Sequence, residues 1–187
     1  LGIETITSGY VIMDDEETIG WNYAPDPSTG KIMPLAVGIP HNDTEIMRSV
    51  KAAWKKQEPV FVVEMDEQET IIHQTFIAEQ SINFPINAEQ LIAVSPPRIK
   101  LHNFNFKEGY LIIVGGTRLT DEQEGMMLRF TKVFQQTYTR FLDLQKAEKQ
   151  ARESQIQLAL ERARTQSMIM QHSNELDDTL RVFHEQI

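Results

Sequence analysis

The sequence predicts an α+β fold, in which an antiparallel sheet is flanked by helices and followed by one long helix. Short runs of alternating apolar and polar residues before residue 117 indicate half-buried strands, and helical patterns lie between them. All eight prolines lie between Pro25 and Pro97, and the last of the nine glycines is Gly125. Residues 126–187 therefore contain no helix breaker and are rich in Gln, Glu, Ala, Arg, Lys and Leu.

Composition limits the class of protein. The chain has 187 residues, of which 41% are hydrophobic and 24% are charged, as in a globular protein. A net charge of −9 argues against a nucleic-acid partner, which needs basic side chains to neutralise phosphates. No apolar run approaches the roughly 18 residues of a membrane span, so we expect no membrane contact from this segment. The absence of cysteine excludes disulfides and zinc sites of the Cys type.

The first elements predicted are three strands. Alternation places them at residues 10–13, 19–23 and 35–39. In the first strand Val11 and Met13 lie on one side, and Tyr10 and Ile12 lie on the other. The acidic run 14–17 forms the turn to the second strand, and residues 25–30 form a loop before the third.

A helix follows the third strand, with Asn42 and Asp43 as its cap and Pro59 after its end. Its apolar face consists of Ile46, Met47, Val50, Ala53 and Trp54. The elements expected next are a buried strand at 60–63, helices at 66–80 and 87–94, and a hairpin of residues 99–106 and 110–114. Ile72 and Phe76 are expected on the core face of the 66–80 helix, and Gly109 is available for a positive φ in the hairpin turn.

The long helix begins after a capping box, in which Thr120 and Gln123 bond each other's unpaired amides. We therefore divide the chain into a sensor-like domain at residues 1–117 and a helical domain at residues 118–187. Residues 118–143 are expected to pack on the first domain, because apolar side chains recur there at steps of three and four. No aromatic residue lies between Phe141 and Phe183, so the rest of the helix lacks the bulk for a globular core.

An isolated helix of this length is marginal, so a partner helix is expected. We predict a parallel homodimer whose interface consists of Phe134, Phe141, Leu144, Ala151, Leu158, Ile169, Leu176 and Phe183. Polar residues interrupt this heptad seam at Glu148, Gln155 and Arg162, which is typical of a coiled coil that changes register. A second stripe, at Ile156 and Leu160, leaves open a phase shift or a bundle of more than two helices.

Residues 105–111, 128–130 and 134–148 resemble the end of a bacterial GAF-type sensor domain. Residues 159–164 and 168–176 are similar to the signalling helix that follows such domains. The resemblance covers roughly residues 98–176 and implies a module that precedes a histidine kinase or nucleotide cyclase output domain, as in two-component systems. The entrance helix of such a domain is missing before Leu1 and no output domain follows Ile187, so we expect a longer parent protein.

The resemblance also implies a possible small-molecule ligand between the sheet and the mid-chain helices. The matching side chains are Trp21, Tyr23, Trp54, His73, Phe76 and His102. The same residues serve equally well as a hydrophobic core, and this alternative stays open. Without cysteine a bilin cannot be attached to a thiol, and no cofactor is expected.

No constellation of residues predicts catalysis or a metal site. The five histidines show no metal-ligand spacing, and Ser8 and Ser95 have no evident base or orienting acid. The function expected is a non-enzymatic sensory and dimerisation module of a cytoplasmic signal-transduction protein. The alternative is a coiled-coil adaptor whose globular domain senses nothing.

Overall fold

The computed structural model describes residues 5–25 and 31–185, and it describes side chains as far as residue 166 and at Met168, Ile169 and Arg181. The chain divides into two compact units, Leu1–Gln136 and Thr137–Ile187. The first unit contains the sheet and the first turns of the long helix, and the second unit contains the remainder of that helix. The predicted division at residue 117 was accompanied by the expectation that residues 118–143 pack on the first domain, and the first unit includes the part of this segment up to Gln136.

The first unit is built on a six-stranded sheet with the order β3-β2-β1-β6-β5-β4. The strands are β1 Thr7–Met13, β2 Ile19–Tyr23, β3 Val37–Pro40, β4 Phe61–Met65, β5 Ile99–Phe106 and β6 Gly109–Gly115. All neighbouring strands are antiparallel, which confirms the predicted fold class. The two hairpins at the ends of the domain sequence meet in the middle, where β1 pairs with β6.

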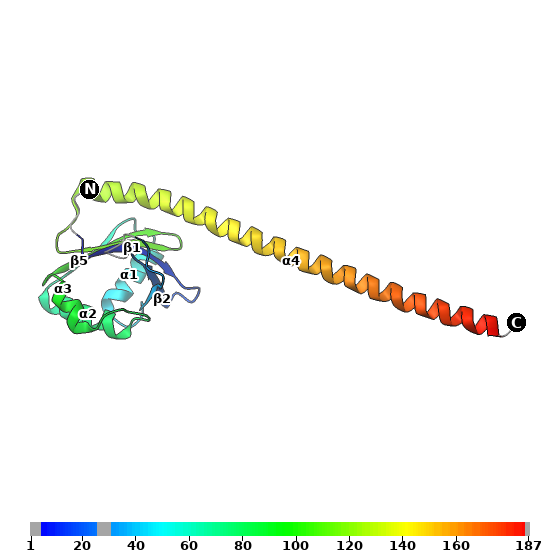
Figure 1. The fold of residues 1–187 in the computed structure, drawn as a ribbon. Helices are drawn as coiled ribbons and strands as arrows, with labels where there is room; N and C mark the ends of the chain where they lie inside the picture. The colour runs from blue at the N-terminus through cyan, green and yellow to red at the C-terminus, as the bar shows by residue number, and fades with distance from the viewer. Residues whose placement is uncertain (1–4, 26–30, 186–187) are drawn as a thin grey trace. The chain divides into compact units, whose positions relative to one another are not determined.

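Three helices cover one face of the sheet: α1 Glu45–Lys55, α2 Glu67–Gln80 and α3 Ala88–Val94 (Figure 1). Capping boxes begin α2 at Asp66 and α3 at Asn87. Helix α1 is capped by Thr44, whose Oγ1 accepts a bond of 3.2 Å from the Met47 amide. The predicted cap at Asn42 and Asp43 was therefore wrong by one or two residues.

The core lies between these helices and the sheet. Val11, Val50, Trp54 and Tyr110 form one buried cluster together with Met13, as the alternation in β1 predicted. Two further clusters contain Met65, Ile99, Leu101 and Val114, and Val37, Ile39 and Met47. The register places residues 7, 9, 11 and 13 of β1 on this inner face and the residues between them on the outer face.

The predicted core face of α2 was wrong at Ile72, whereas Phe76 packs on the core cluster of Val37, Ile39 and Met47. Ile72 is 59% exposed, and the residues that the helix buries are Thr70, His73 and Gln74. Thr70 is satisfied because its Oγ1 accepts a bond of 3.3 Å from the Ile99 amide, and Gln74 Nε2 donates to Ser95 Oγ at 2.9 Å. Polar partners from other elements thus override the hydrophobic pattern.

Gly109 is required for close approach and not for a positive φ. A Cβ atom at this position would collide with the carbonyl oxygen of Val11 on the neighbouring strand β1. No left-handed φ accompanies Gly109, which corrects the reason that the sequence suggested. The glycine therefore lets β6 lie beside the end of β1.

Helix α4 runs over Asp121–Glu185. The predicted capping box is confirmed: Gln123 N donates to Thr120 Oγ1 at 3.3 Å, and Thr120 N donates to Gln123 Oε1 at 2.9 Å. Within the first unit its early turns pack on the outer face of the sheet, where the Phe134 ring lies 5.0 Å from Tyr10 and 5.3 Å from Phe106. Among the described residues, no helix combines the length and apolarity needed to cross a membrane.

Candidate functional site

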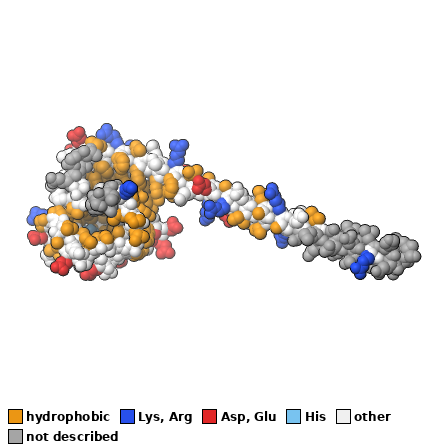
Figure 2. All heavy atoms as spheres, viewed as in Figure 1, with side chains coloured by type: hydrophobic (Ala, Val, Ile, Leu, Met, Phe, Trp, Pro, Cys, Tyr) orange, Lys and Arg blue, Asp and Glu red, His pale blue; other side chains and the backbone are white. Residues whose placement is uncertain are grey.

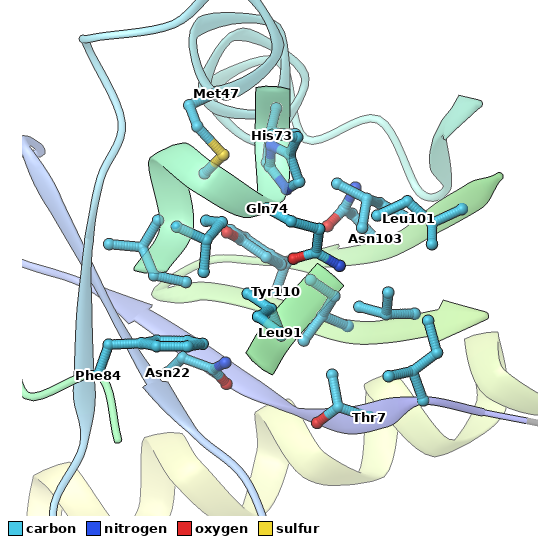
Figure 3. A pocket seen from close by; sticks show the side chains of 17 residues that line it. Thr7, Asn22, Met47, His73, Gln74, Phe84, Leu91, Leu101, Asn103 and Tyr110 are labelled. Atoms are coloured by element: carbon cyan, nitrogen blue, oxygen red, sulfur yellow. The ribbon is translucent and has the colours of Figure 1, made fainter. Parts of the chain in front are cut away.

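A cavity of about 110 Å³ lies inside the first unit, between the inner face of the sheet and helices α1–α3 (Figure 3). Most of its lining is aliphatic, from residues such as Ile39, Leu91 and Ile112. Its polar lining side chains are Thr7, Asn22, His73, Gln74, Asn103 and Tyr110. A largely apolar pocket with a few converging polar groups is the usual form of a small-molecule site.

The strand period positions the polar groups on the sheet side of the cavity. Asn22 pairs with Val11 across β2 and β1, and Asn103 pairs with Ile112 across β5 and β6, so both asparagines share the inner face with core residues. His73 and Gln74 come from α2 on the opposite side, and Figure 3 shows their side chains directed toward the sheet. Both walls of the cavity therefore carry hydrogen-bonding groups.

Three buried polar atoms at this cavity have no hydrogen-bond partner among the described residues. They are Asn22 Oδ1, His73 Nδ1 and Asn103 Oδ1. His73 is 6% exposed and Asn103 is 1% exposed, so bulk water does not supply the missing bonds. An unpaired buried polar group typically costs about 1–3 kcal/mol, and three at one cavity are unusual in a folded domain.

Two other polar side chains of the lining, Gln74 and Tyr110, are paired. Tyr110 shares a hydrogen bond of 2.8 Å with His41 Nε2, and His41 Nδ1 lies 2.7 Å from the Ile39 carbonyl oxygen. Asn103 Nδ2 donates to the Phe61 carbonyl oxygen at 3.2 Å. These bonds fix the orientation of Tyr110 and Asn103, so that the Asn103 carboxamide oxygen is the atom left unpaired.

The described residues that line the cavity carry no charge near pH 7. Burial lowers the pKa of His73 to about 4, so its imidazole is uncharged. Burial raises the pKa of Tyr110 above its usual value, so the phenol keeps its proton. Within the part of the chain that the structure describes, the residues that line the cavity include no Asp, Glu, Lys or Arg.

The structure places the six residues predicted for a ligand pocket in different environments. His73 lines the cavity, and Phe76 packs beside it on the cluster of Val37, Ile39 and Met47. Trp54 belongs to the core, where its indole Nε1 donates to the Phe106 carbonyl oxygen at 3.0 Å.

Trp21, Tyr23 and His102 lie on the outer face of the sheet. Trp21 pairs with Ile12 and Tyr23 pairs with Tyr10, on which its ring stacks at 4.8 Å. His102 Nε2 accepts a bond of 3.1 Å from the Leu119 amide, just before α4. These three side chains do not line the cavity, because successive strand residues point to opposite faces.

The sequence reasoning missed Asn22, Gln74 and Asn103. Each is the immediate neighbour of a predicted residue: Asn22 follows Trp21, Gln74 follows His73, and Asn103 follows His102. The sequence contains one signal for such residues. A polar residue two positions from an inward-facing apolar residue of the same strand faces the same side, as Asn103 does with Leu101. Such a residue is buried with the core and must either find a partner or bind a ligand.

The residues predicted for the dimer interface fall into three groups. Phe141, Leu144, Leu158 and Ile169 are between 49% and 60% exposed, and Ala151 is also exposed. Phe134 packs within its own unit on Tyr10 and Phe106. The side chains of Leu176 and Phe183 lie outside the described residues.

The helix of the second unit carries further exposed apolar side chains. Ile156 is 54% exposed and Leu160 is 59% exposed, so the second stripe seen in the sequence also lacks cover within the described chain. Figure 2 shows hydrophobic side chains on the helix surface among charged ones. Among the described residues, no group of three or more His, Cys, Asp or Glu could hold a metal ion.

Comparison with protein-family models, with curated proteins and with solved structures gives no match to this chain.

Proposed function

We propose that this chain is a non-enzymatic sensory and dimerisation module of a cytoplasmic signal-transduction protein. In this proposal a small molecule binds the cavity of the first unit, and the signal passes through a parallel coiled coil of two α4 helices to an output domain. The observation that carries the proposal is the course of α4. Its first turns belong to the domain that contains the cavity, and the same helix then continues to Glu185 with large apolar side chains exposed.

Dimerisation is supported by the spacing of the exposed side chains. One heptad position recurs every seven residues at Leu144, Ala151 and Leu158. The other seam position contains Phe141 and Ile169, which are 28 residues, or four heptads, apart. A helix of this length gains little stability from its own hydrogen bonds, because most helical stability in water comes from burying an apolar face. Pairing with a second copy would bury this stripe by knobs-into-holes packing.

Sensing is supported by the cavity and by the sequence resemblance to GAF-type domains. The cavity combines aliphatic walls with unpaired polar atoms, which a bound molecule would satisfy. The fold itself does not decide the function, because one fold hosts many functions. The proposal therefore depends on the site and on the helix.

The absence of cysteine allows a direct test of the dimer and of its direction. Single variants Gln145→Cys and Gln166→Cys each carry one spin label at an exposed position of α4. A parallel in-register dimer places like labels at the same height on helices roughly 10 Å apart, so both variants give short distances. An antiparallel pair that overlaps over the whole helix Asp121–Glu185 would separate like labels along the axis by about 24 Å at residue 145 and about 39 Å at residue 166, at 1.5 Å per residue.

Light scattering on the unlabelled chain supplies the second measurement. A dimer mass at micromolar concentration is expected, and a monomer mass would refute the module proposed here. A ligand that binds the first unit and leaves the label distances and helix stability unchanged would favour the adaptor alternative.

A further inference from the structure

The three unpaired polar atoms of the cavity restrict what it can bind. We propose that the cavity takes an uncharged molecule of about four to seven non-hydrogen atoms that carries an N–H donor, of the class of five-membered nitrogen heterocycles and small amides. The inference rests on the proposed sensory function, because it names the class of ligand for the same cavity. It follows from the charge, the hydrogen-bonding atoms and the volume of the site.

Charge excludes ions. The described lining residues include no Asp, Glu, Lys or Arg, and His73 on the wall stays neutral because burial disfavours its charged form. A carboxylate, phosphate or ammonium group placed here would lose its hydration without gaining a counter-charge. Nucleotides and amino-acid zwitterions are therefore outside the class.

Hydrogen bonding selects a donor. Asn103 holds its Nδ2 on the Phe61 carbonyl oxygen, so its Oδ1 is presented to the cavity as an acceptor. Asn22 Oδ1 is a second unpaired acceptor on the lining, and His73 Nδ1 accepts or donates according to its tautomer. A ligand with one or two N–H groups satisfies these atoms, whereas a pure hydrocarbon leaves them unpaired.

Volume sets the size. A dry protein cavity of about 150 Å³ is known to hold benzene, so a cavity of about 110 Å³ suits a five-membered ring or a small amide. The aliphatic walls, which include Leu101 and Ile112, contact the faces of such a molecule. The class is therefore small, planar, neutral and able to donate.

Two matched pairs of probes test the inference on the full chain. Pyrazole and furan have similar rings, but pyrazole alone carries N–H. Acetamide and acetate have the same shape, but acetate is an anion. The readout is the shift of the methyl NMR signals of Leu101 and Ile112 during titration with each probe. We expect pyrazole and acetamide to bind at least tenfold more tightly than furan and acetate.

A variant pair separates the cavity from the rest of the strand. Asn103→Leu removes an unpaired acceptor in the cavity, and Asn105→Leu removes an unpaired acceptor on the same strand and face that does not line it. Asn105 is otherwise comparable, since its Nδ2 donates to the Glu58 carbonyl oxygen at 2.7 Å. Asn103→Leu should abolish the preference for pyrazole over furan, and Asn105→Leu should keep it.

The possible failures are distinguishable. If acetate binds as well as acetamide, if furan equals pyrazole, or if none of the probes shifts these methyl signals at millimolar concentration, the ligand class is wrong. Light scattering on the same samples tests the dimer separately. A dimer without probe binding overturns only the ligand class, whereas probe binding to a monomer overturns the proposed module and keeps the cavity chemistry.

Discussion

The burial of two histidines predicts a loss of stability in mild acid that can be worked out from the structure. Burial lowers the pKa of both His41 and His73 from 6.5 to about 4. The unfolded chain binds a proton at each position as the pH falls below 6.5, whereas the folded chain does not until about pH 4. The contribution of these two neutral histidines to the free energy of unfolding is therefore fully present above pH 6.5. It is lost progressively as the pH falls from 6.5 to about 4.

The magnitude follows from the two pKa values. Lowering the pH from 7 to 5 should cost about 2 kcal/mol per buried histidine, or about 4 kcal/mol for the pair. Carboxylates with ordinary pKa values stay largely ionised in both states above pH 5, so they contribute little here. Asp14 and Lys51 act on His41 in opposite directions, and both effects are smaller than that of burial.

Urea unfolding followed by tryptophan fluorescence is the assay, because both tryptophans, Trp21 and Trp54, report on the first unit. The free energy of unfolding is measured at pH 7, 6 and 5 for the wild type and for His73→Gln. The variant should lose about 2 kcal/mol less than the wild type between pH 7 and pH 5, whatever its stability at pH 7. His41→Gln is the matched control and should reduce the loss of unfolding free energy between pH 7 and pH 5 by a similar amount. An identical pH dependence in wild type and His73→Gln would show that His73 is not buried in its neutral form, and the neutral cavity would be refuted.

Three further predictions concern the sheet and the helix. Gly109→Ala should destabilise the first unit by about 3 kcal/mol or more in the same urea assay, because its Cβ would collide with the Val11 carbonyl oxygen. Gly125→Ala is the control, because its new Cβ meets open space. It should leave the free energy of unfolding unchanged or raise it by up to about 1 kcal/mol. Equal effects of the two would contradict the strand contact. Leu144→Asp should weaken dimerisation by about 2–3 kcal/mol in sedimentation equilibrium and leave the tryptophan transition unchanged; loss of that transition would show that Leu144 belongs to the domain core. Replacement of the polar seam residues by isoleucine should raise the dimer melting temperature and lock the output of the parent protein, and a more stable dimer that still switches would refute a register change. The residues replaced together are Glu148, Gln155 and Arg162.

Local signals allowed much of the fold to be predicted from the sequence. The alternation around Val11 identified β1 and its inner face, and the capping pair Thr120 and Gln123 identified the start of α4. These signals depend on residues that are close in sequence, so they can be read without knowledge of the tertiary contacts. The antiparallel α+β class then followed from the order of elements.

The cavity could not be predicted in the same way, because its residues depend on contacts far apart in the sequence. The resemblance to GAF-type domains suggested Trp21 and Tyr23, but the pairing of β1 with β2 turns both outward and turns Asn22 inward. On α2 the hydrophobic pattern favoured Ile72, but Gln74 is buried because Ser95 lies within hydrogen-bond distance. A single sequence does not contain the strand register that decides these cases.

The strand period that misplaced the pocket residues also explains how a cavity ligand would act on α4. Along β1, Thr7 lines the cavity on the inner face, and Tyr10 contacts Phe134 of α4 on the outer face. Along β6, Tyr110 lines the cavity, whereas the next residue, Leu111, faces outward opposite Tyr10. Only one layer of backbone therefore separates the cavity from the first turns of the helix. Packed layers transmit small displacements because they leave no space to absorb them. In the proposed module, a ligand that changes the spacing of β1 and β6 would directly change the packing of Phe134 on Tyr10, without a long chain of intervening side chains.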